Sequence, residues 1–364
     1  MTPLICQALR RDSATPIGWQ VAPFGDGGGQ CVYRFAGDAQ DQGAIMPWSL
    51  VVKVARRNEH DDPAGARYWK RELLAYQSGL LANLPAGLSA PRCFGVLEWP
   101  DGECWLWLEE ITDAARGRWS PERFLAVAHQ LGRFNAAYLT TRPLPAYPWL
   151  SQGWFRRHVA AAAADVAQLP GLRDHPFLRL ALPGATADRV LRLWEERDTL
   201  CDALDRLPQT FCHLDINPRN LLVRDRGSGE IQSVAIDWEF AGVSAIGAEL
   251  ASLIGGSLVF GLTDLDTADE LEAGVMDSYL AGMQETGWGG DERHVRLGYI
   301  IALELHITLV LLWMIEEAVR NEGFRQWVEQ STGRPYAELA ARTAPVFEFF
   351  LSRTDEARQL LRSV

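Results

Sequence analysis

Two short segments in the second half of the chain gather residues whose types and spacing could do chemistry. Segment 213–220 reads HLDINPRN, and segment 233–239 reads SVAIDWE. Asn220 precedes one apolar run and Asp237 ends another, so two adjacent strands would aim Asp215, Asn220 and Asp237 at one point. Carboxylate and amide oxygens suit Mg²⁺, which takes other ligands from water and phosphates. A carboxylate beside the metal could accept a proton from an attacking hydroxyl, as phosphoryl transfer requires.

The other parts of such a site come earlier in the chain, in the expected order. A glycine-rich turn that could cover phosphates comes first and contains Gly25, Gly27, Gly28 and Gly29. Lys53, one of only two lysines, lies in the strand-like run SLVVKVA, and Glu72 follows on a helix where it could pair with Lys53. The segment WLEEI at 107–111 ends a strand. These residues also have purely structural interpretations. The glycines could form a plain hairpin turn, and Lys53 and Glu72 could form an ion pair without a role in function.

As a set, these segments resemble the aminoglycoside phosphotransferase family and its choline-kinase relatives, which have the protein-kinase-like fold. The pattern H-x-D-x-x-x-x-N, the segment IDWEFAG at 236–242 and the segment GAEL at 247–250 carry the resemblance. It implies that Asp215 is the catalytic base and that Asn220 and Asp237 hold Mg²⁺. For the nucleotide, ATP or GTP, it implies contacts from the glycine cluster, from Lys53 steadied by Glu72, and from the backbone of Glu109 and Ile111. It also implies structural roles for His213 and Glu249.

The sequence departs from the protein kinases in three places. Their H-R-D is H-L-D here, their D-F-G is Asp-Trp-Glu, and no long activation loop separates Asp237 from Gly247. These differences favour a small-molecule kinase over a protein kinase. The glycine segment reads GDGGGQ, which differs from the G-x-G-x-x-G pattern.

The acceptor is predicted to be the hydroxyl of a small, amine-bearing and therefore cationic molecule. By resemblance, an aminoglycoside-type antibiotic is the leading class, and the enzyme would then confer antibiotic resistance. Glu239, Trp238 and the apolar-helix residue Glu304 are candidates for the acceptor site, with Glu316 and Glu317 as further acidic residues. The alternatives are a metabolite kinase acting on choline, ethanolamine, an amino sugar or a hydroxy amino acid, or a non-catalytic nucleotide-binding protein.

The elements that must position these residues predict an α+β, bilobal, protein-kinase-like fold. Alternating apolar residues predict a hairpin on either side of the glycines, a strand at 49–55, and two strands across the Pro-Asp-Gly turn at 100–102. Helical spacing predicts a helix from Ala64 to Leu81 and another from a Ser120 cap. We therefore expect a β-rich nucleotide-binding lobe at 1–112 and a mainly helical catalytic and acceptor-binding lobe at 113–364.

Composition limits the class of protein. The chain has 364 residues and a net charge of −12, so it lacks the basic character of a nucleic-acid-binding protein. Six scattered cysteines suit a reducing compartment, no signal peptide is visible, and the apolar run 300–315 is interrupted by charged and polar residues. We expect a cytoplasmic protein without a membrane span, as a monomer or homodimer.

Overall fold

The computed structural model describes residues 1–24, 31–113, 118–225 and 231–363, in two compact units. The first unit combines residues 1–116, 147–150 and 220–241, and the second combines residues 117–146, 151–219 and 242–364. The glycine cluster Gly25, Gly27, Gly28 and Gly29 lies outside the described residues.

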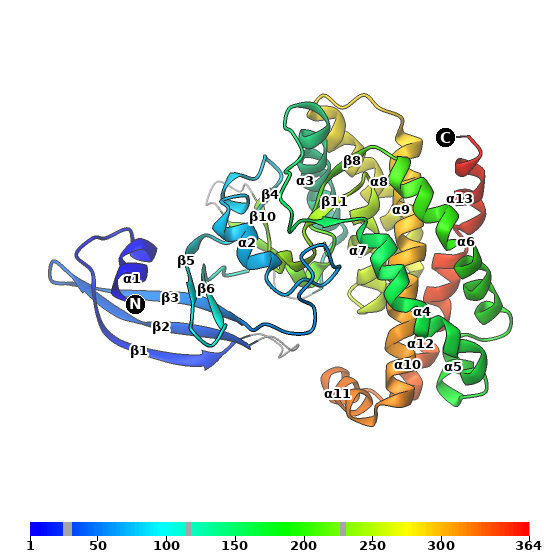
Figure 1. Cartoon of the computed structure of the whole chain (residues 1–364), viewed down its shortest axis with the longest axis horizontal. Helices are drawn as coiled ribbons and strands as arrows, with labels where there is room; N and C mark the ends of the chain where they lie inside the picture. The colour runs from blue at the N-terminus through cyan, green and yellow to red at the C-terminus, as the bar shows by residue number, and fades with distance from the viewer. Residues whose placement is uncertain (25–30, 114–117, 226–230, 364) are drawn as a thin grey trace. The chain divides into compact units, whose positions relative to one another are not determined.

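A five-stranded antiparallel sheet dominates the first unit (Figure 1). Its order is β1 (Thr15–Pro23), β2 (Cys31–Asp41), β3 (Ala44–Ala55), β6 (Cys104–Glu109) and β5 (Cys93–Glu98). Strands β1 and β2 form the hairpin predicted around the glycines, and β5 and β6 form the hairpin predicted around Pro-Asp-Gly. Gly102 has φ 84° in that second turn, a conformation that glycine adopts without strain.

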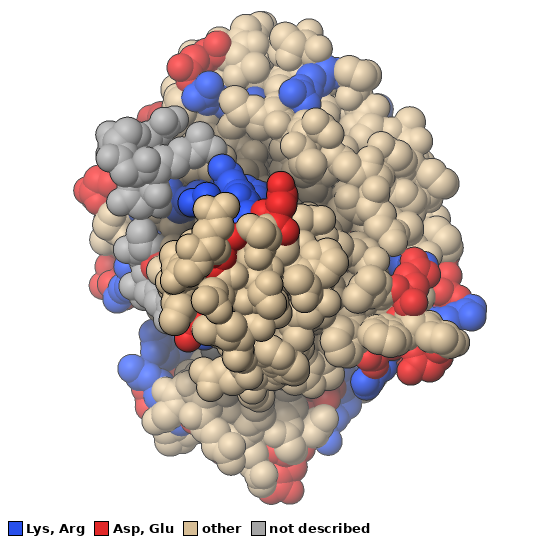
Figure 2. All heavy atoms as spheres, turned by 90° about the vertical axis from the view of Figure 1, so that its left-hand side faces the viewer, with Lys and Arg blue, Asp and Glu red and all other residues tan. Residues whose placement is uncertain are grey.

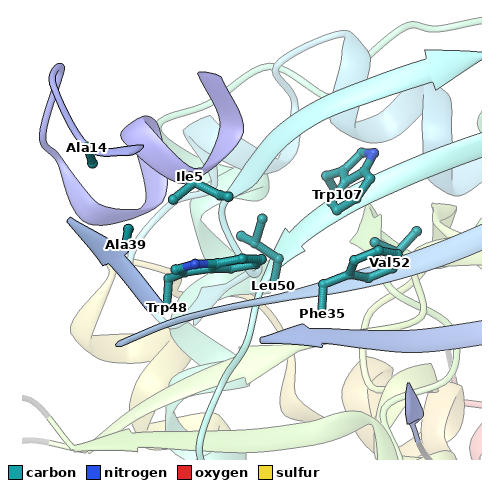
Figure 3. Packing of buried hydrophobic residues seen from close by; sticks show 8 residues of the cluster. All are labelled: Ile5, Ala14, Phe35, Ala39, Trp48, Leu50, Val52 and Trp107. Carbon is teal, nitrogen blue, oxygen red and sulfur yellow. The ribbon is translucent and has the colours of Figure 1, made fainter. Parts of the chain in front are cut away.

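One face of this sheet packs against helix α1 (Thr2–Leu9) (Figure 3). Residues two apart on a strand share a face, so Phe35 of β2 and Leu50 and Val52 of β3 point to the same side. The cluster on this side contains Ile5, Ala14, Phe35, Ala39, Trp48, Leu50, Val52 and Trp107. Lys53 lies between the buried Val52 and the partly buried Val54, which both pack on this side, so its side chain points to the opposite face.

Helix α2 (Arg71–Gln77) begins later than the sequence predicted. The expected start at Ala64 is wrong because residues 62–66 form a turn, in which the N–H groups of Ala64 and Gly65 donate to Asp62. The first unit also contains the 3₁₀ turns η1 (Leu81–Asn83) and η3 (Trp238–Phe240). Its small sheet has the order β4 (Leu88–Ser89), β10 (Ile231–Ala235) and β9 (Leu221–Asp225), and the 3₁₀ turn η2 (Pro218–Asn220) leads into β9.

The second unit is mainly helical. Its helices are α3 (Pro121–Thr140), α4 (Trp154–Leu172), α5 (Pro176–Ala181), α6 (Thr186–Arg206), α7 (Ala248–Val259), α8 (Ala268–Glu285), α9 (Glu292–Ala302), α10 (Thr308–Arg320), α11 (Glu322–Thr332), α12 (Tyr336–Leu351) and α13 (Thr354–Leu361). Helix α3 starts at the predicted Ser120 cap. A three-stranded sheet has the order β7 (Ser151–Gln152), β11 (Gly242–Ala245) and β8 (Gln209–Cys212), and a 3₁₀ turn, η4 (Leu265–Thr267), precedes α8.

Two glycines allow α3 and α8 to pack closely. A methyl group on Gly132 would collide with the carbonyl of Tyr279, and one on Gly282 would collide with the carbonyl of His129. The backbones of the two helices are therefore in contact at these positions.

Helices α9 and α10 are joined by a π-helical segment, η5 (Leu303–Ile307), into one 29-residue helix from Glu292 to Arg320. This helix extends beyond the apolar run 300–315, and it is long and apolar enough to cross a membrane. Its length therefore does not support the expectation that the chain has no segment able to span a membrane. However, 83% of its most apolar window is buried within the structure, which is the environment of a core helix.

Candidate active site

Strand β3 and helix α2 bring together the basic and acidic residues predicted to meet at the nucleotide phosphates. Lys53 Nζ lies 2.6 Å from Glu72 Oε2, so the ion pair predicted from the sequence is present. Lys53 also donates to Asp237 Oδ1, at the end of the β9–β10 hairpin. The Lys53 and Glu72 side chains are 11% and 8% exposed, whereas Asp237 is 38% exposed. Asp237 is therefore the member of this cluster that is most accessible to a ligand.

The charged groups of this cluster shift one another's pKa values. Burial alone would lower the pKa of Lys53, but the charges of Glu72 and Asp237 outweigh burial and hold that pKa above its ordinary value. Lys53 thus stays protonated, and one ammonium faces two carboxylates. Burial and the charge of Asp237 raise the pKa of Glu72, although Lys53 opposes this effect. A cation bound beside Asp237 would favour the ionised form of both carboxylates.

Asn220 and Asp237 lie at the same end of one antiparallel hairpin, as the sequence predicted. The N–H of Ile236 donates to the carbonyl of Asn220 at 2.9 Å, and Ala235 pairs with Leu221. Together these two side chains offer carboxylate and amide oxygens, a donor set that suits Mg²⁺ when phosphates and water complete the shell. Among the described residues no cluster of three His, Cys, Asp or Glu side chains could hold a metal without such help. The residues present therefore fit a metal that arrives with a nucleotide.

Residues 109–111, whose backbone is predicted to bind the purine base, lie at the end of β6 and just beyond it. The N–H of Glu109 donates to the carbonyl of Arg92 at 2.8 Å, so this N–H belongs to the sheet. The Glu109 carboxylate accepts from Arg224 at 2.6 Å, and Arg34 donates to both oxygens of Glu110 at 2.8 Å. These ion pairs hold the segment, in which Ile111 follows beyond the end of the strand.

The loop that carries Asp215 belongs to the helical unit and follows β8. The Asn217 amide donates to Asp215 Oδ1 at 2.8 Å, and the N–H of Asp215 donates to His213 Nδ1 at 3.2 Å. Leu214 has φ 68°, a left-handed conformation that is unusual for a side chain of this size. The loop is thus held in a strained shape, and Asn217 orients the carboxylate of Asp215.

Glu249 of α7 stabilises this loop by accepting hydrogen bonds from its backbone. Its Oε1 accepts the N–H groups of His213 at 2.6 Å and of Leu214 at 3.1 Å, and its Oε2 accepts from Asn135 at 2.8 Å. Burial raises the pKa of Glu249, while these donors favour its charged form. The structural contact that the sequence suggested for Glu249 is therefore present, and Asn135 of α3 belongs to the same network.

The three acceptor-site candidates differ in their surroundings. Trp238 is fully buried, and its indole N–H donates to the carbonyl of Ala235 at 2.9 Å, so this ring packs inside the first unit and has no surface to offer an acceptor. Glu304 of η5 is also fully buried, which argues against direct contact with an acceptor in this structure. Glu239 is half-buried, and its carbonyl accepts from Arg71 at 2.6 Å.

Three polar residues of the site were not singled out from the sequence. Asn217 lies within the HLDINPRN motif, and its side-chain oxygen accepts the N–H of Arg219 at 3.0 Å in an Asx turn. An asparagine directly before Pro218 is typical of such a turn, a signal that could have identified it. Asn135 and Arg71 lie on ordinary amphipathic helices. Asn135 bonds to Glu249, 114 positions away, and Arg71 bonds to Glu239, 168 positions away, so the sequence contains no local signal for these two contacts.

Charged side chains on the face shown in Figure 2 lie in small groups that mix acidic and basic residues. Uncharged side chains cover most of the area nearest the viewer in this figure.

Comparison with known proteins gives one family match. Residues 21–289 match the model described as the phosphotransferase enzyme family, APH. No curated protein matches the sequence.

Many solved structures are similar to the chain. A choline kinase from Cryptosporidium parvum Iowa II has a TM-score of 0.56 at 11% identity, over 94% of this chain and 90% of that chain. The GDP complex of aminoglycoside 2'-phosphotransferase-IIIa has a TM-score of 0.55 at 14% identity, over 93% and 94%. An amicoumacin kinase in complex with AMP-PNP, Ca²⁺ and Ami has a TM-score of 0.51 at 17% identity, over 87% and 89%. These likenesses confirm the predicted α+β, protein-kinase-like fold.

Proposed function

The chain belongs to the APH phosphotransferase enzyme family, and from this premise we propose that it transfers the γ-phosphoryl group of ATP or GTP to a hydroxyl of a small cationic molecule. The observation that carries the proposal is the Lys53 ammonium held between the Glu72 and Asp237 carboxylates. A protonated lysine on a strand, beside an accessible carboxylate at a hairpin end, is the arrangement that phosphate binding with a divalent cation requires.

In the proposed reaction, the residues of the first unit bind the nucleotide. Lys53 donates to α- and β-phosphate oxygens, while Glu72 keeps its side chain in place. Asn220 and Asp237 would hold Mg²⁺, which would supply positive charge that offsets the charge of the phosphates. The Glu109 carbonyl and the Ile111 N–H bind the purine base.

Asp215 performs the proton transfer. Its carboxylate accepts the proton of the acceptor hydroxyl as the acceptor oxygen forms a bond to the γ-phosphorus. The bond from that phosphorus to the β–γ bridging oxygen breaks at the same time, and ADP or GDP leaves. Asn217, which donates to Asp215 Oδ1 at 2.8 Å, keeps the carboxylate plane oriented for this step.

Two features support a small cationic acceptor. Only η3 and β11 lie between Asp237 and the start of α7 at Ala248, so this part of the chain has no long segment for docking a protein substrate. The net charge of −12 would attract a cation at long range. The similar solved structures are named as kinases of an aminoglycoside, of choline and of amicoumacin, and these acceptors define the first panel to test.

All six cysteines are free thiols, which supports a cytoplasmic location.

The test is ADP and GDP release with Mg²⁺ across aminoglycosides, macrolides, choline, ethanolamine, amino sugars and hydroxy amino acids. Asp215→Asn serves as the blank, and Asp277→Asn, an exposed carboxylate on α8, is the matched control. We expect turnover with one acceptor class, a decrease of about 10²–10⁴-fold in Asp215→Asn, and no change in Asp277→Asn.

Turnover that survives in Asp215→Asn would show that another group is the base. If no acceptor on the panel is phosphorylated while Mg-nucleotide still binds, the hypothesis of an aminoglycoside acceptor is the first to be rejected. A chain that binds no nucleotide would contradict the proposal as a whole.

A further inference from the structure

Arg71, the first residue of α2, has a fully buried side chain. A guanidinium group carries five N–H donors, and in Arg71 each of them has a backbone carbonyl as acceptor. The acceptors are Trp149 at 2.8 Å, Ala66 at 3.0 Å, Glu239 at 2.6 Å, Pro63 at 3.3 Å, and Gly65. All of these residues belong to the first unit.

These five carbonyls come from three separate parts of the chain. Residues 63–66 form the turn before α2, Trp149 lies in the segment 147–150, and Glu239 lies in η3, immediately after the candidate metal ligand Asp237. A planar guanidinium with fixed donor directions can hold three segments in one arrangement, whereas the single ammonium of a lysine has three donors and no fixed plane.

The bond to Glu239 matters because of the conformation of the turn that contains it. Asp237 has φ 62° and ψ 58°, in the left-handed region that a non-glycine residue occupies only when its surroundings hold it there. Glu72 accepts the N–H of Trp238 at 3.3 Å, and Arg71 donates to the carbonyl of Glu239. Two consecutive residues of α2 thus hold the backbone just after Asp237, one through an N–H and the other through a carbonyl.

We propose that Arg71 is a positioning residue that holds the 237–239 turn in the conformation presenting the Asp237 carboxylate to the metal–nucleotide complex. The identity of that ligand rests on the proposed function, whereas the positioning itself rests on the contacts of Arg71. Arg71 acts through Glu239, so its loss should weaken metal binding more than it affects binding of the acceptor.

The experiment compares Arg71→Met and Arg71→Lys with Arg296→Met in the full chain. Arg296 is partly buried, with its side chain 24% exposed, and pairs with Glu272 and Glu356 in the helical unit, so its loss removes charge-assisted bonds away from α2. Two quantities are measured: Mn²⁺ binding in the presence of ADP, by electron paramagnetic resonance, and amide hydrogen exchange of peptides that cover 236–241.

We expect Arg71→Met to weaken Mn²⁺ binding about tenfold or more, the usual effect of losing a charge-assisted hydrogen bond, and to speed exchange at 236–241. Arg71→Lys should restore part of both, and Arg296→Met should change neither. If the kinase assay finds an acceptor, the KM for Mg²⁺ should rise in Arg71→Lys with little change in the KM for the acceptor.

Unchanged Mn²⁺ binding and unchanged exchange in folded Arg71→Met would overturn the proposal. Equal effects in Arg296→Met would overturn it too, because general destabilisation would then explain both. Should Arg71→Met fail to fold, unchanged values in Arg71→Lys would count against it. If the wild-type chain binds no Mn²⁺ with ADP, the proposed function fails, and the exchange measurement alone decides whether Arg71 holds the turn.

Discussion

Replacing Glu304 by glutamine should remove a pH-dependent loss of stability. Glu304 lies in the π-helical segment η5 and is fully buried, and within the described residues neither carboxylate oxygen has a hydrogen-bond partner. Burial raises the pKa of this carboxyl from an ordinary 4.5 to about 7, and the nearby Thr354 hydroxyl and the charge of Arg358 offset only part of that effect. The folded chain therefore disfavours the ionised form.

The sign and size of the effect follow from these two pKa values. Below pH 4.5 the carboxyl is protonated in both folded and unfolded chains, so it imposes no cost. As the pH rises toward 7, the unfolded chain releases the proton while the folded chain keeps it, and the free energy of unfolding falls. At 1.36 kcal/mol per pH unit, the interval from 4.5 to about 7 corresponds to a loss of about 3 kcal/mol.

The assay is urea unfolding followed by far-UV circular dichroism between roughly pH 5.5 and 8.5 for the wild type, Glu304→Gln and the control Glu270→Gln. This range lies above the isoelectric point of about 5.1, where the chain is least soluble. Glu270 is exposed on α8, so its replacement should leave the pH dependence unchanged. About 2 kcal/mol of the loss falls between pH 5.5 and 7, and Glu304→Gln should gain this amount relative to the wild type. Parallel stability curves for the two proteins would refute the reasoning.

Three further predictions concern the helical unit. Gly282→Ala should destabilise the fold by about 1–3 kcal/mol because its methyl group would collide with α3, whereas Gly171→Ala, which meets no atom within 4 Å, should be neutral or slightly stabilising; thermal unfolding will show whether the two differ. Asn217→Ala should lower kcat about tenfold with an unchanged nucleotide KM, and an unaltered kcat would mean that Asp215 needs no such support. Glu249→Ala should cost about 3 kcal/mol or more because it leaves buried N–H donors without an acceptor, and a melting temperature equal to that of the wild type would contradict this account.

Much of the site follows from neighbours in the sequence. Alternating apolar residues fix the hairpins on either side of Gly25–Gly29 and Pro-Asp-Gly, and apolar runs beside Asn220 and Asp237 place both at one hairpin end. Lys53 stands out because lysine is rare in this chain. These features depend on residues close in sequence, so the pattern of side chains is sufficient to predict them. The start predicted for α2 was too early because the spacing of apolar residues does not show that the backbone carbonyl of Gly65 is bonded to the Arg71 side chain.

The sequence by itself thus determined the family resemblance, the order of the chemical residues and the strand pairings within hairpins. Only the tertiary structure decided that one ammonium serves two carboxylates, Glu72 and Asp237, and that Trp238 is buried. It also decided the contacts of Arg71, whose guanidinium reaches the carbonyl of Glu239, 168 residues away. Every residue except proline has the same backbone N–H and C=O groups. A contact made to them leaves no mark in the amino-acid sequence, and it exists only once the fold brings distant segments together.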